Sequence, residues 1–270
     1  MKNIPLVYNK LTAFIFVIIS IVSISCEKVV DIDLNSSSPR IVIEGSISDQ
    51  AGPYVVTLSQ TVNFDETNVF PPMSGANIVL SDNVGNSESL IETLPGIYKT
   101  SSMRGLPGRT YTLAVTADGQ EYIAVSTMPN PVRIDYLTVQ DQNFGRNQMK
   151  VINVQFRDPH DIKNYYRFVE VKNKVEQKFI FLYDDRVQDG SAITSSLFAD
   201  EDTLQTGDTV IVWLQCIDKG VFDYFRTMRQ ASGGGGPQAA SPANPLSNFT
   251  NGALGYFNAY AVRGDRIIIP

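Results

Sequence analysis

The stretch that decides the fold class spans residues 111–127 and reads Tyr111-Thr-Leu-Ala-Val-Thr-Ala-Asp-Gly-Gln-Glu-Tyr-Ile-Ala-Val-Ser-Thr127. Its first half places Tyr111, Leu113 and Val115 at alternate positions, the period of a strand with one buried face. Asp118-Gly119 follows, and this pair tolerates the positive φ that both central residues of the favoured hairpin turn need. The stretch therefore predicts a β-hairpin.

Short β-rich segments of the same kind, separated by turn residues, lie on both sides of this hairpin. They cover residues 41–47, 54–59, 76–80, 90–91, 97–98, 132–139, 149–156, 165–171, 178–183, 209–217, 254–262 and 266–269. One helix is predicted over residues 219–230, because Asp218 can cap it and Val221, Phe222, Phe225 and Met228 share one face. The pattern predicts a mostly β fold of two immunoglobulin- or transthyretin-like β-sandwich domains, with one short helix in the second.

The division of the chain follows from its turn residues. Met128-Pro-Asn-Pro131 predicts a junction between an N-terminal β-sandwich domain, residues 40–130, and a C-terminal β-rich domain, residues 131–270. In the second domain, residues 209–217 are apolar on both faces and are expected to form the most buried strand. Cys216 is then a small core residue rather than a nucleophile. Arg263-Gly-Asp265 is expected to separate two closing strands, and residues 233–236 to form a flexible connector.

The amino terminus has the layout of an export signal. Lys2 and Lys10 precede an apolar run over residues 11–22, and no charge follows until Glu27. The uncharged stretch of 16 residues is shorter than the ~20 that a membrane-spanning helix needs. This layout predicts a removable signal peptide over residues 1–25. Residues 26–39 are polar and rich in serine, so they are expected to form a tether.

The end of this signal, Ser23-Ile-Ser-Cys26, resembles the lipobox of bacterial lipoproteins, with Ser23 where leucine is usual. The resemblance implies cleavage between Ser25 and Cys26 and lipidation of the Cys26 thiol. We expect an outer-membrane location exposed at the cell surface, with the periplasmic face as the alternative. Two or three acyl chains hold a protein stably on a membrane. An ordinary secretory signal with an incidental cysteine and an uncleaved anchor helix are the two alternatives.

Charge and motif content exclude several classes of function. The formal net charge is −6, and no run of Lys or Arg is present, which argues against a nucleic-acid partner. His160 is the only histidine and lies between aspartates, so an exposed turn residue is favoured over a catalytic base. G-x-S-x-G, H-E-x-x-H and P-loop motifs are absent. We therefore expect no catalytic residues, no metal site, no cofactor and no enzymatic activity.

Two acidic groups and one aromatic group remain as candidate sites. Asp184-Asp185 with Asp189, and Asp200-Glu-Asp202, do not match a calcium-binding loop, so solvated loop charge is favoured over a hydrolase site. Leu254-Gly-Tyr-Phe-Asn-Ala-Tyr260 contains three aromatic residues, Tyr256, Phe257 and Tyr260. Alternation sends Tyr256 and Tyr260 to one face and Phe257 to the other. Core packing explains them most simply, and a surface for a glycan or partner protein is the alternative.

Several stretches together resemble one family of outer-membrane lipoproteins, the domain-of-unknown-function 4249 family. They are Cys26-Glu-Lys28, Asp31-Ile-Asp33, Ile41-Val-Ile-Glu-Gly45, Gly52-Pro-Tyr54, Pro71-Pro-Met-Ser-Gly-Ala-Asn-Ile78, Gly108-Arg-Thr-Tyr-Thr-Leu113, Asn164-Tyr-Tyr-Arg167 and Gly252-Ala-Leu-Gly-Tyr-Phe257. Residues 75–127 separately resemble transthyretin-like or carboxypeptidase-regulatory β-domains.

The family resemblance has consequences for function. Such proteins are commonly encoded beside TonB-dependent transporters, which implies a non-enzymatic accessory that binds such a transporter and aids nutrient import. The family has no established catalytic residues to carry over. A free-standing glycan- or peptide-binding lipoprotein is the alternative, and a surface hydrolase is the least favoured hypothesis.

Overall fold

The computed structural model describes residues 38–63, 67, 69–144, 147–186, 189–198, 204–234 and 244–270. The predicted signal peptide, its cleavage site, the lipidation site Cys26 and the predicted tether up to residue 37 lie outside the described residues. So do the Asp200–Asp202 cluster and residues 235–243 of the long loop. In the described ranges, no helix combines the length and the apolar character needed to cross a membrane.

The described chain is mostly β, with one α-helix, which confirms the predicted fold class. The strands up to the predicted junction are β1 (Ile41–Ser48), β2 (Val55–Gln60), β3 (Asn77–Asp82), β4 (Ser87–Ser89), β5 (Ile91–Leu94), β6 (Ile97–Lys99), β7 (Thr110–Ala117) and β8 (Gln120–Thr127). The later elements are β9 (Ile134–Phe144), β10 (Asn147–Arg157), β11 (Tyr165–Lys172), β12 (Val175–Glu176), β13 (Phe181–Asp184), β14 (Ala192–Leu197), β15 (Thr209–Ile217), α2 (Lys219–Arg229) and β16 (Leu254–Ile268).

The hairpin predicted over residues 111–127 is present as β7 and β8. Ala117 pairs with Gln120, so Asp118 and Gly119 form the two-residue turn, with φ angles of 49° and 75°. Tyr111, Leu113 and Val115 are fully buried, as their alternation predicts. Local sequence alone was sufficient here, because the turn sets the register and the register sets which face is buried.

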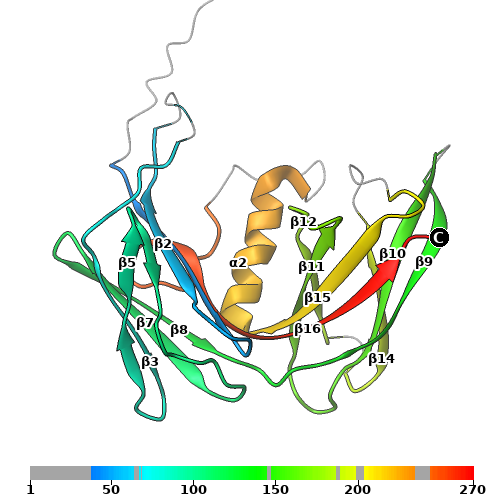
Figure 1. Cartoon of the computed structure of the whole chain (residues 1–270), viewed down its shortest axis with the longest axis horizontal. Helices are drawn as coiled ribbons and strands as arrows, with labels where there is room; N and C mark the ends of the chain where they lie inside the picture. The colour runs from blue at the N-terminus through cyan, green and yellow to red at the C-terminus, as the bar shows by residue number, and fades with distance from the viewer. Residues whose placement is uncertain are drawn as a thin grey trace, which may run out of the picture. The chain divides into compact units, whose positions relative to one another are not determined.

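The strands form three sheets (Figure 1), and the largest has the order β12-β11-β15-β16-β1-β2-β6-β5, with β13 also pairing with β11. The two smaller sheets have the orders β14-β10-β9 and β4-β3-β7-β8. In the large sheet β16 pairs in parallel with β1 and antiparallel with β15. One late strand therefore joins the first part of the chain to the second by backbone hydrogen bonds.

The buried side chains form two separate main cores. The first contains buried residues between Ile41 and Met128 together with residues of β16, and the second contains residues from Val132 onward. Each core has one wall from the large sheet and one from a smaller sheet. The predicted junction at residue 130 thus falls between the two cores, while the large sheet runs across it. The domain limits themselves stay a prediction.

β16 corrects one local prediction. Arg263-Gly-Asp265 was expected to separate two strands, but these residues pair with Leu214, Trp213 and Val212 of β15 and the strand is continuous. Nearer its start, Gly255 has a φ of 92°, and a Cβ there would lie 2.0 Å from the carbonyl oxygen of Ile43. Only glycine allows β16 to approach β1 this closely.

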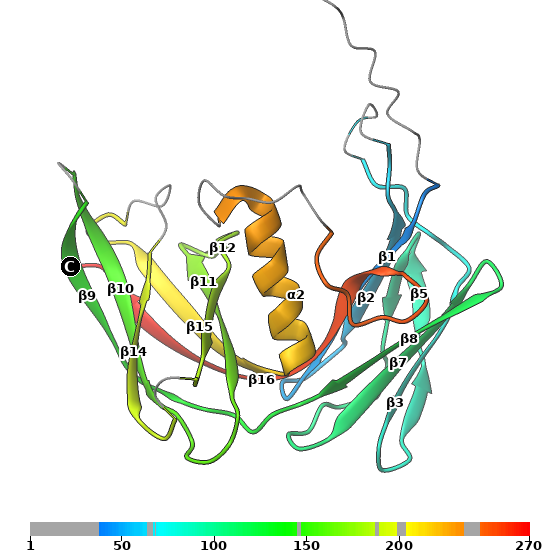
Figure 2. The ribbon, with the colours of Figure 1, turned by 180° about the vertical axis from the view of Figure 1, so that it is seen from behind.

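The predicted helix is present, with its cap and its buried face. The Asp218 side chain accepts a hydrogen bond from the Val221 amide, and Val221, Phe222 and Phe225 are buried. After α2, residues 230–234 continue as one turn of π-helix, η1 (Gln230–Gly234), so the expectation of a flexible connector is wrong for Gly233 and Gly234. Figure 2 shows α2 from behind, and its contacts are with β16, β11 and β13 of the large sheet.

Candidate functional site

Asp218 ties the start of α2 to two other parts of the chain. One oxygen of its carboxylate accepts from the Val221 amide at 2.9 Å, and the other accepts from the Ser126 hydroxyl at 2.6 Å and the Thr127 amide at 3.1 Å. The Ser126 oxygen in turn accepts from the Ala259 amide of β16 at 2.9 Å. A single carboxylate therefore sets how α2 leaves the sheet, and with it which side chains of the sheet the helix covers.

The aromatic residues predicted as a candidate ligand or partner surface lie in two environments. Tyr256 packs under α2, with its ring centroid 4.7 Å from that of Tyr224 and 5.0 Å from that of Phe225. Tyr260 is partly buried in the same cluster. Phe257 is fully buried in the first core, so it is not available to a ligand in this structure. The alternation predicted for the three is present, and ligand binding by Tyr256 and Tyr260 stays a prediction.

Arg167 of β11 is the cation of this cluster. Its guanidinium lies 4.3 Å from the centre of the Phe225 ring and donates to the Gln215 side chain at 3.0 Å. Its Nε has no hydrogen-bond partner among the described residues. Burial lowers the pKa of Arg167 and raises the pKa values of Tyr256 and Tyr260. The helix therefore shields a polar, aromatic patch of the sheet from water.

The acidic residues of the second domain are only partly solvated. Asp185 is buried and accepts from the Asn164 amide at 2.7 Å, and Asp158 is buried and accepts from the Tyr166 hydroxyl. The expectation of solvated loop charge is therefore wrong for Asp185. Asp184 is partly buried, and its carboxylate accepts from the Arg186 Nε at 2.8 Å. Asp189 is exposed and accepts from the Asp161 amide at 3.1 Å.

A metal ion is the obvious ligand to test on these carboxylates. One oxygen each from Asp158, Asp185 and Asp189 lie within 4.8 Å of one another, as do ligand atoms of His160, Asp161 and Asp189. The two buried carboxylates are already satisfied by protein donors, and the His160 side chain is 76% exposed. The donor set thus resembles a hydrogen-bonded loop anchor more than a dedicated cation cage, which needs several unoccupied oxygens converging on one point.

Cys216 lies in the second core, as predicted. It is 2% exposed, and its sulfur accepts from the Val132 amide at 3.2 Å. Burial raises the pKa of its thiol to about 12. The thiol is therefore protonated at neutral pH and unreactive in the folded chain.

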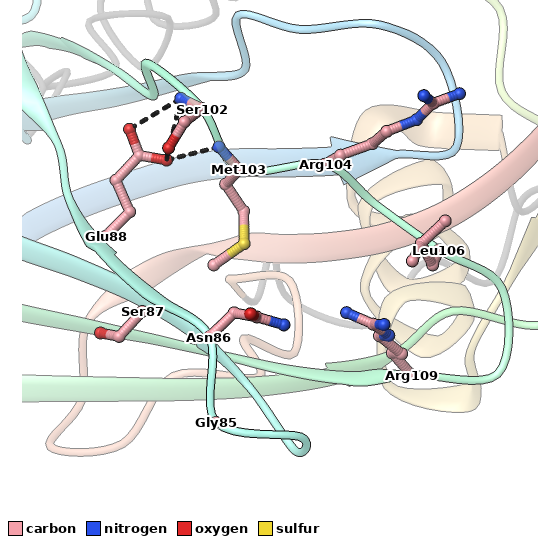
Figure 3. Close-up of a pocket in the computed structure, with 9 residues that line it drawn as sticks. All are labelled: Gly85, Asn86, Ser87, Glu88, Ser102, Met103, Arg104, Leu106 and Arg109. Atoms are coloured by element: carbon pink, nitrogen blue, oxygen red, sulfur yellow. Dashed lines mark hydrogen bonds between the residues drawn. The ribbon is translucent and has the colours of Figure 1, made fainter.

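A polar pocket at one end of the first core was missed by sequence reasoning. Its volume is about 500 Å³, and Figure 3 shows its walls, from the β3–β4 turn and the loop before β7. The Glu88 carboxylate holds that loop by accepting from the Met103 amide at 2.6 Å and the Ser102 amide at 3.1 Å. Although burial by itself raises the pKa of Glu88, these backbone hydrogen bonds lower it overall. Glu88 is thus a structural anion, bound by the loop.

Two arginines and two carboxylates lie in or beside this pocket, so its charges are largely balanced. Arg109 donates to Asp82 at 2.7 Å. Burial alone would raise the pKa of Asp82, but hydrogen bonds from Asn86, Val84 and Arg109 lower it to about 2. Arg104 is exposed and extends away from Glu88 (Figure 3). No residue spacing marks this pocket in the sequence, because its walls come from turns whose meeting depends on the sheet.

Comparison with known proteins assigns the family. Residues 27–266 match the family described as domain of unknown function (DUF4249). The chain belongs to this family. No curated protein matches it. Among solved structures, the Yersinia pseudotuberculosis adhesin InvE aligns at 18% identity over 65% of this chain and 55% of the adhesin chain, with a TM-score of 0.22. That score is too low to carry an argument.

The DUF4249 match confirms the family named from sequence. In this DUF4249 protein, the residues singled out from sequence lie in a helix-covered cluster (Tyr256, Tyr260), in cores (Phe257, Cys216) and in an acidic loop anchor (Asp185, Asp189). Their environments differ because burial depends on which sheet faces another layer, and this cannot be taken from strand alternation alone.

Proposed function

We propose that this protein is a non-enzymatic lipoprotein of the outer membrane that acts as an accessory of a TonB-dependent nutrient transporter. The observation that carries the proposal is the placement of Cys26, directly after the small residues that close an apolar run behind two lysines. Acylation there would hold the β-rich body at the membrane surface, since two or three acyl chains give stable anchoring. The DUF4249 membership supports the transporter partner through the resemblance described above.

The anchor is tested first, because the location depends on it. Mass spectrometry of the purified chain should show an acylated Cys26 as the first residue. Cys26→Ser should release the protein from the membrane fraction or leave it unprocessed, whereas Cys216→Ala should not change its fractionation. An unacylated Cys26, or a Cys26→Ser variant with unchanged fractionation and electrophoretic mobility, would refute lipidation.

The partner is tested in detergent-solubilised membranes. A tagged copy of the full chain should co-purify with a transporter barrel, and the barrel should be identified by mass spectrometry. Repeated recovery of the acylated protein without any barrel would contradict the accessory role while leaving the anchor intact.

The second candidate function is a free-standing lipoprotein that binds a glycan or peptide. The pocket with Arg104 favours it, because this exposed arginine lies beside polar backbone and a guanidinium can bind an anionic group. Tyr256→Ala and Tyr260→Ala test the sequence-based site, and a loss of binding without unfolding would support it. A pH-dependent hydrolytic activity abolished by Asp185→Asn would instead indicate an enzyme and would contradict both functions.

A further inference from the structure

The face of the large sheet that α2 covers continues beyond the helix. Along β15, residues two apart share a face, so Gln215, Trp213 and Ile211 point to the same side, about 6.6 Å apart. Gln215 is buried beside Arg167, while Trp213 is 38% exposed. The strand expected to be the most buried therefore exposes its largest side chain at the point where the helix no longer covers the sheet.

The Trp213 ring lies directly over a glycine of the neighbouring strand. Gly264 of β16 pairs with it, and a Cβ on Gly264 would lie 2.5 Å from both Cε3 and Cζ3 of the indole. Any larger residue would push the ring off the strand. The indole therefore lies against β16 on one side, and its exposed part forms an aromatic surface.

A cavity of about 390 Å³ lies on the same face, one residue pair further along. Val171, Ile211 and Arg266 form that next row of paired residues, immediately beyond the row that contains Trp213 and Gly264. Asn173, Lys174 and Thr209 complete its lining. The cavity thus has an apolar floor, two cationic side chains at its edge and an exposed indole beside it.

Neither Arg266 nor Lys174 is in an ion pair within the described part of the chain, while Glu176, which pairs with Val171 of the lining, adds a carboxylate to the same face. Arg266 makes no ion pair there, and its guanidinium is 3.5 Å from the Thr209 hydroxyl. Asp208, which precedes Thr209 of the lining, accepts from the Asn173 side chain at 2.7 Å and from the Gln205 amide at 2.9 Å. These two bonds fix the Asp208 carboxylate but do not remove its charge, and neither cation of the edge is paired with it.

The loop that carries Lys174 is built in an unusual conformation. Asn173 and Lys174 form the two-residue turn between β11 and β12, with φ angles of 49° and 72°. The Asn173 side chain is fixed because it donates to Asp208 and accepts from the Thr209 amide at 3.0 Å. Positive φ at both central residues is usual for a two-residue hairpin turn, but a lysine in the left-handed region is uncommon. The turn therefore places Lys174 at the edge of the cavity at some expense of conformational energy.

We propose that this face binds an acidic saccharide. The apolar face of a sugar ring stacks on Trp213, and the sugar carboxylate lies between Arg266 and Lys174. A planar aromatic surface suits the C–H face of a pyranose ring, and guanidinium and ammonium groups without an ion-pair partner in the described ranges suit a carboxylate. Binding here requires neither the lipid anchor nor the transporter, so the proposal goes beyond the accessory role.

The chain contains a single tryptophan, so its fluorescence reports directly on this face. We would titrate the full acylated chain in detergent with oligogalacturonate, using the methyl-esterified oligomer as the uncharged control. The expected result is a saturable change in emission with the acid form, with affinity falling about tenfold for the ester, as for loss of a charge-assisted hydrogen bond. No emission change, or equal affinity for the two oligomers, would overturn the proposal.

Matched variants separate this site from general charge effects. Arg266→Gln and Lys174→Gln should each weaken binding several-fold, while Arg133→Gln, an exposed arginine of the same charge before β9, should not. Trp213→Ala should abolish binding measured by calorimetry, whereas Tyr136→Ala, an exposed aromatic of β9, should not. Circular dichroism checks that each variant folds. Binding of polyglutamate as tightly as oligogalacturonate, or binding that survives Trp213→Ala, would contradict a saccharide site.

Discussion

Arginine and aromatic residues lie at both ends of one face of the large sheet, but their environments differ. Near α2, Arg167 and Tyr256 pack against Phe225 and are shielded from water. Further along the same strands, Trp213 and Arg266 have similar chemistry and remain exposed. The difference is the helix, which covers one end and not the other. An aromatic residue beside an arginine is therefore a core contact or a binding surface according to what lies above it.

The largest expected loss of stability comes from truncating a side chain of α2 that covers the sheet. Phe225 is 4% exposed and contacts both Tyr256 and Arg167, so Phe225→Ala should lower the free energy of unfolding by about 3–5 kcal/mol. Urea unfolding followed by circular dichroism measures the loss. Trp213→Ala, at the uncovered end, should cost clearly less. Equal losses would mean that the two ends do not differ in burial as described.

A smaller loss of stability is expected for a substitution at Asp218, where α2 begins. Asp218→Ala removes the cap of α2 and its bonds to Ser126 and Thr127, and should destabilise by about 1–2 kcal/mol. Asp223→Ala, on the same helix, breaks only surface pairs with Lys219 and Arg226 and should cost about 0.5 kcal/mol. If both variants lose the same amount, the cap does not hold the helix in place.

The stability contributed by Tyr256 and Tyr260, which α2 covers, should also fall at high pH. Burial raises the pKa values of Tyr256 and Tyr260, so their protonated forms stabilise the fold fully below the unfolded pKa of about 10. Stability is then lost as the pH rises from there through the higher folded values. The urea midpoint should fall between pH 9 and pH 11, and fall less in Tyr256→Phe. The exposed Tyr136→Phe is the control, and an equal effect there would contradict the assignment.

The smallest effect on stability is expected for Gly264→Ala. The new methyl group would clash with the indole of Trp213, and because that ring is partly exposed it can move away at a cost of less than about 1 kcal/mol. The emission of the single tryptophan should shift even though the urea midpoint hardly changes. An unchanged emission spectrum would show that Gly264 does not set the position of the ring. Gly108→Ala, at a site open to solvent, is the spectral control.

Local elements of this protein could be predicted because each depends on residues close in sequence. The hairpin at Asp118-Gly119 and the helix capped by Asp218 are examples, since turn and capping preferences act over a few residues. Cys216 was correctly predicted as a core residue from the apolar strand around it. The prediction failed at Arg263-Gly-Asp265, because a turn-like composition is overridden when β15 offers a full set of backbone partners.

The sequence by itself determined the fold class, the family, the hairpins and the helix, and it carries the Cys26 pattern from which a membrane anchor is proposed. Only the tertiary structure decided that β16 joins both cores, that α2 covers Tyr256, and that Trp213 stays exposed against Gly264. The physical reason is the distance along the sequence over which each kind of interaction acts. Turns and caps depend on neighbouring residues, whereas exposure depends on contacts between strands more than 35 residues apart in the sequence, such as β15 with β11 and β16 with β1.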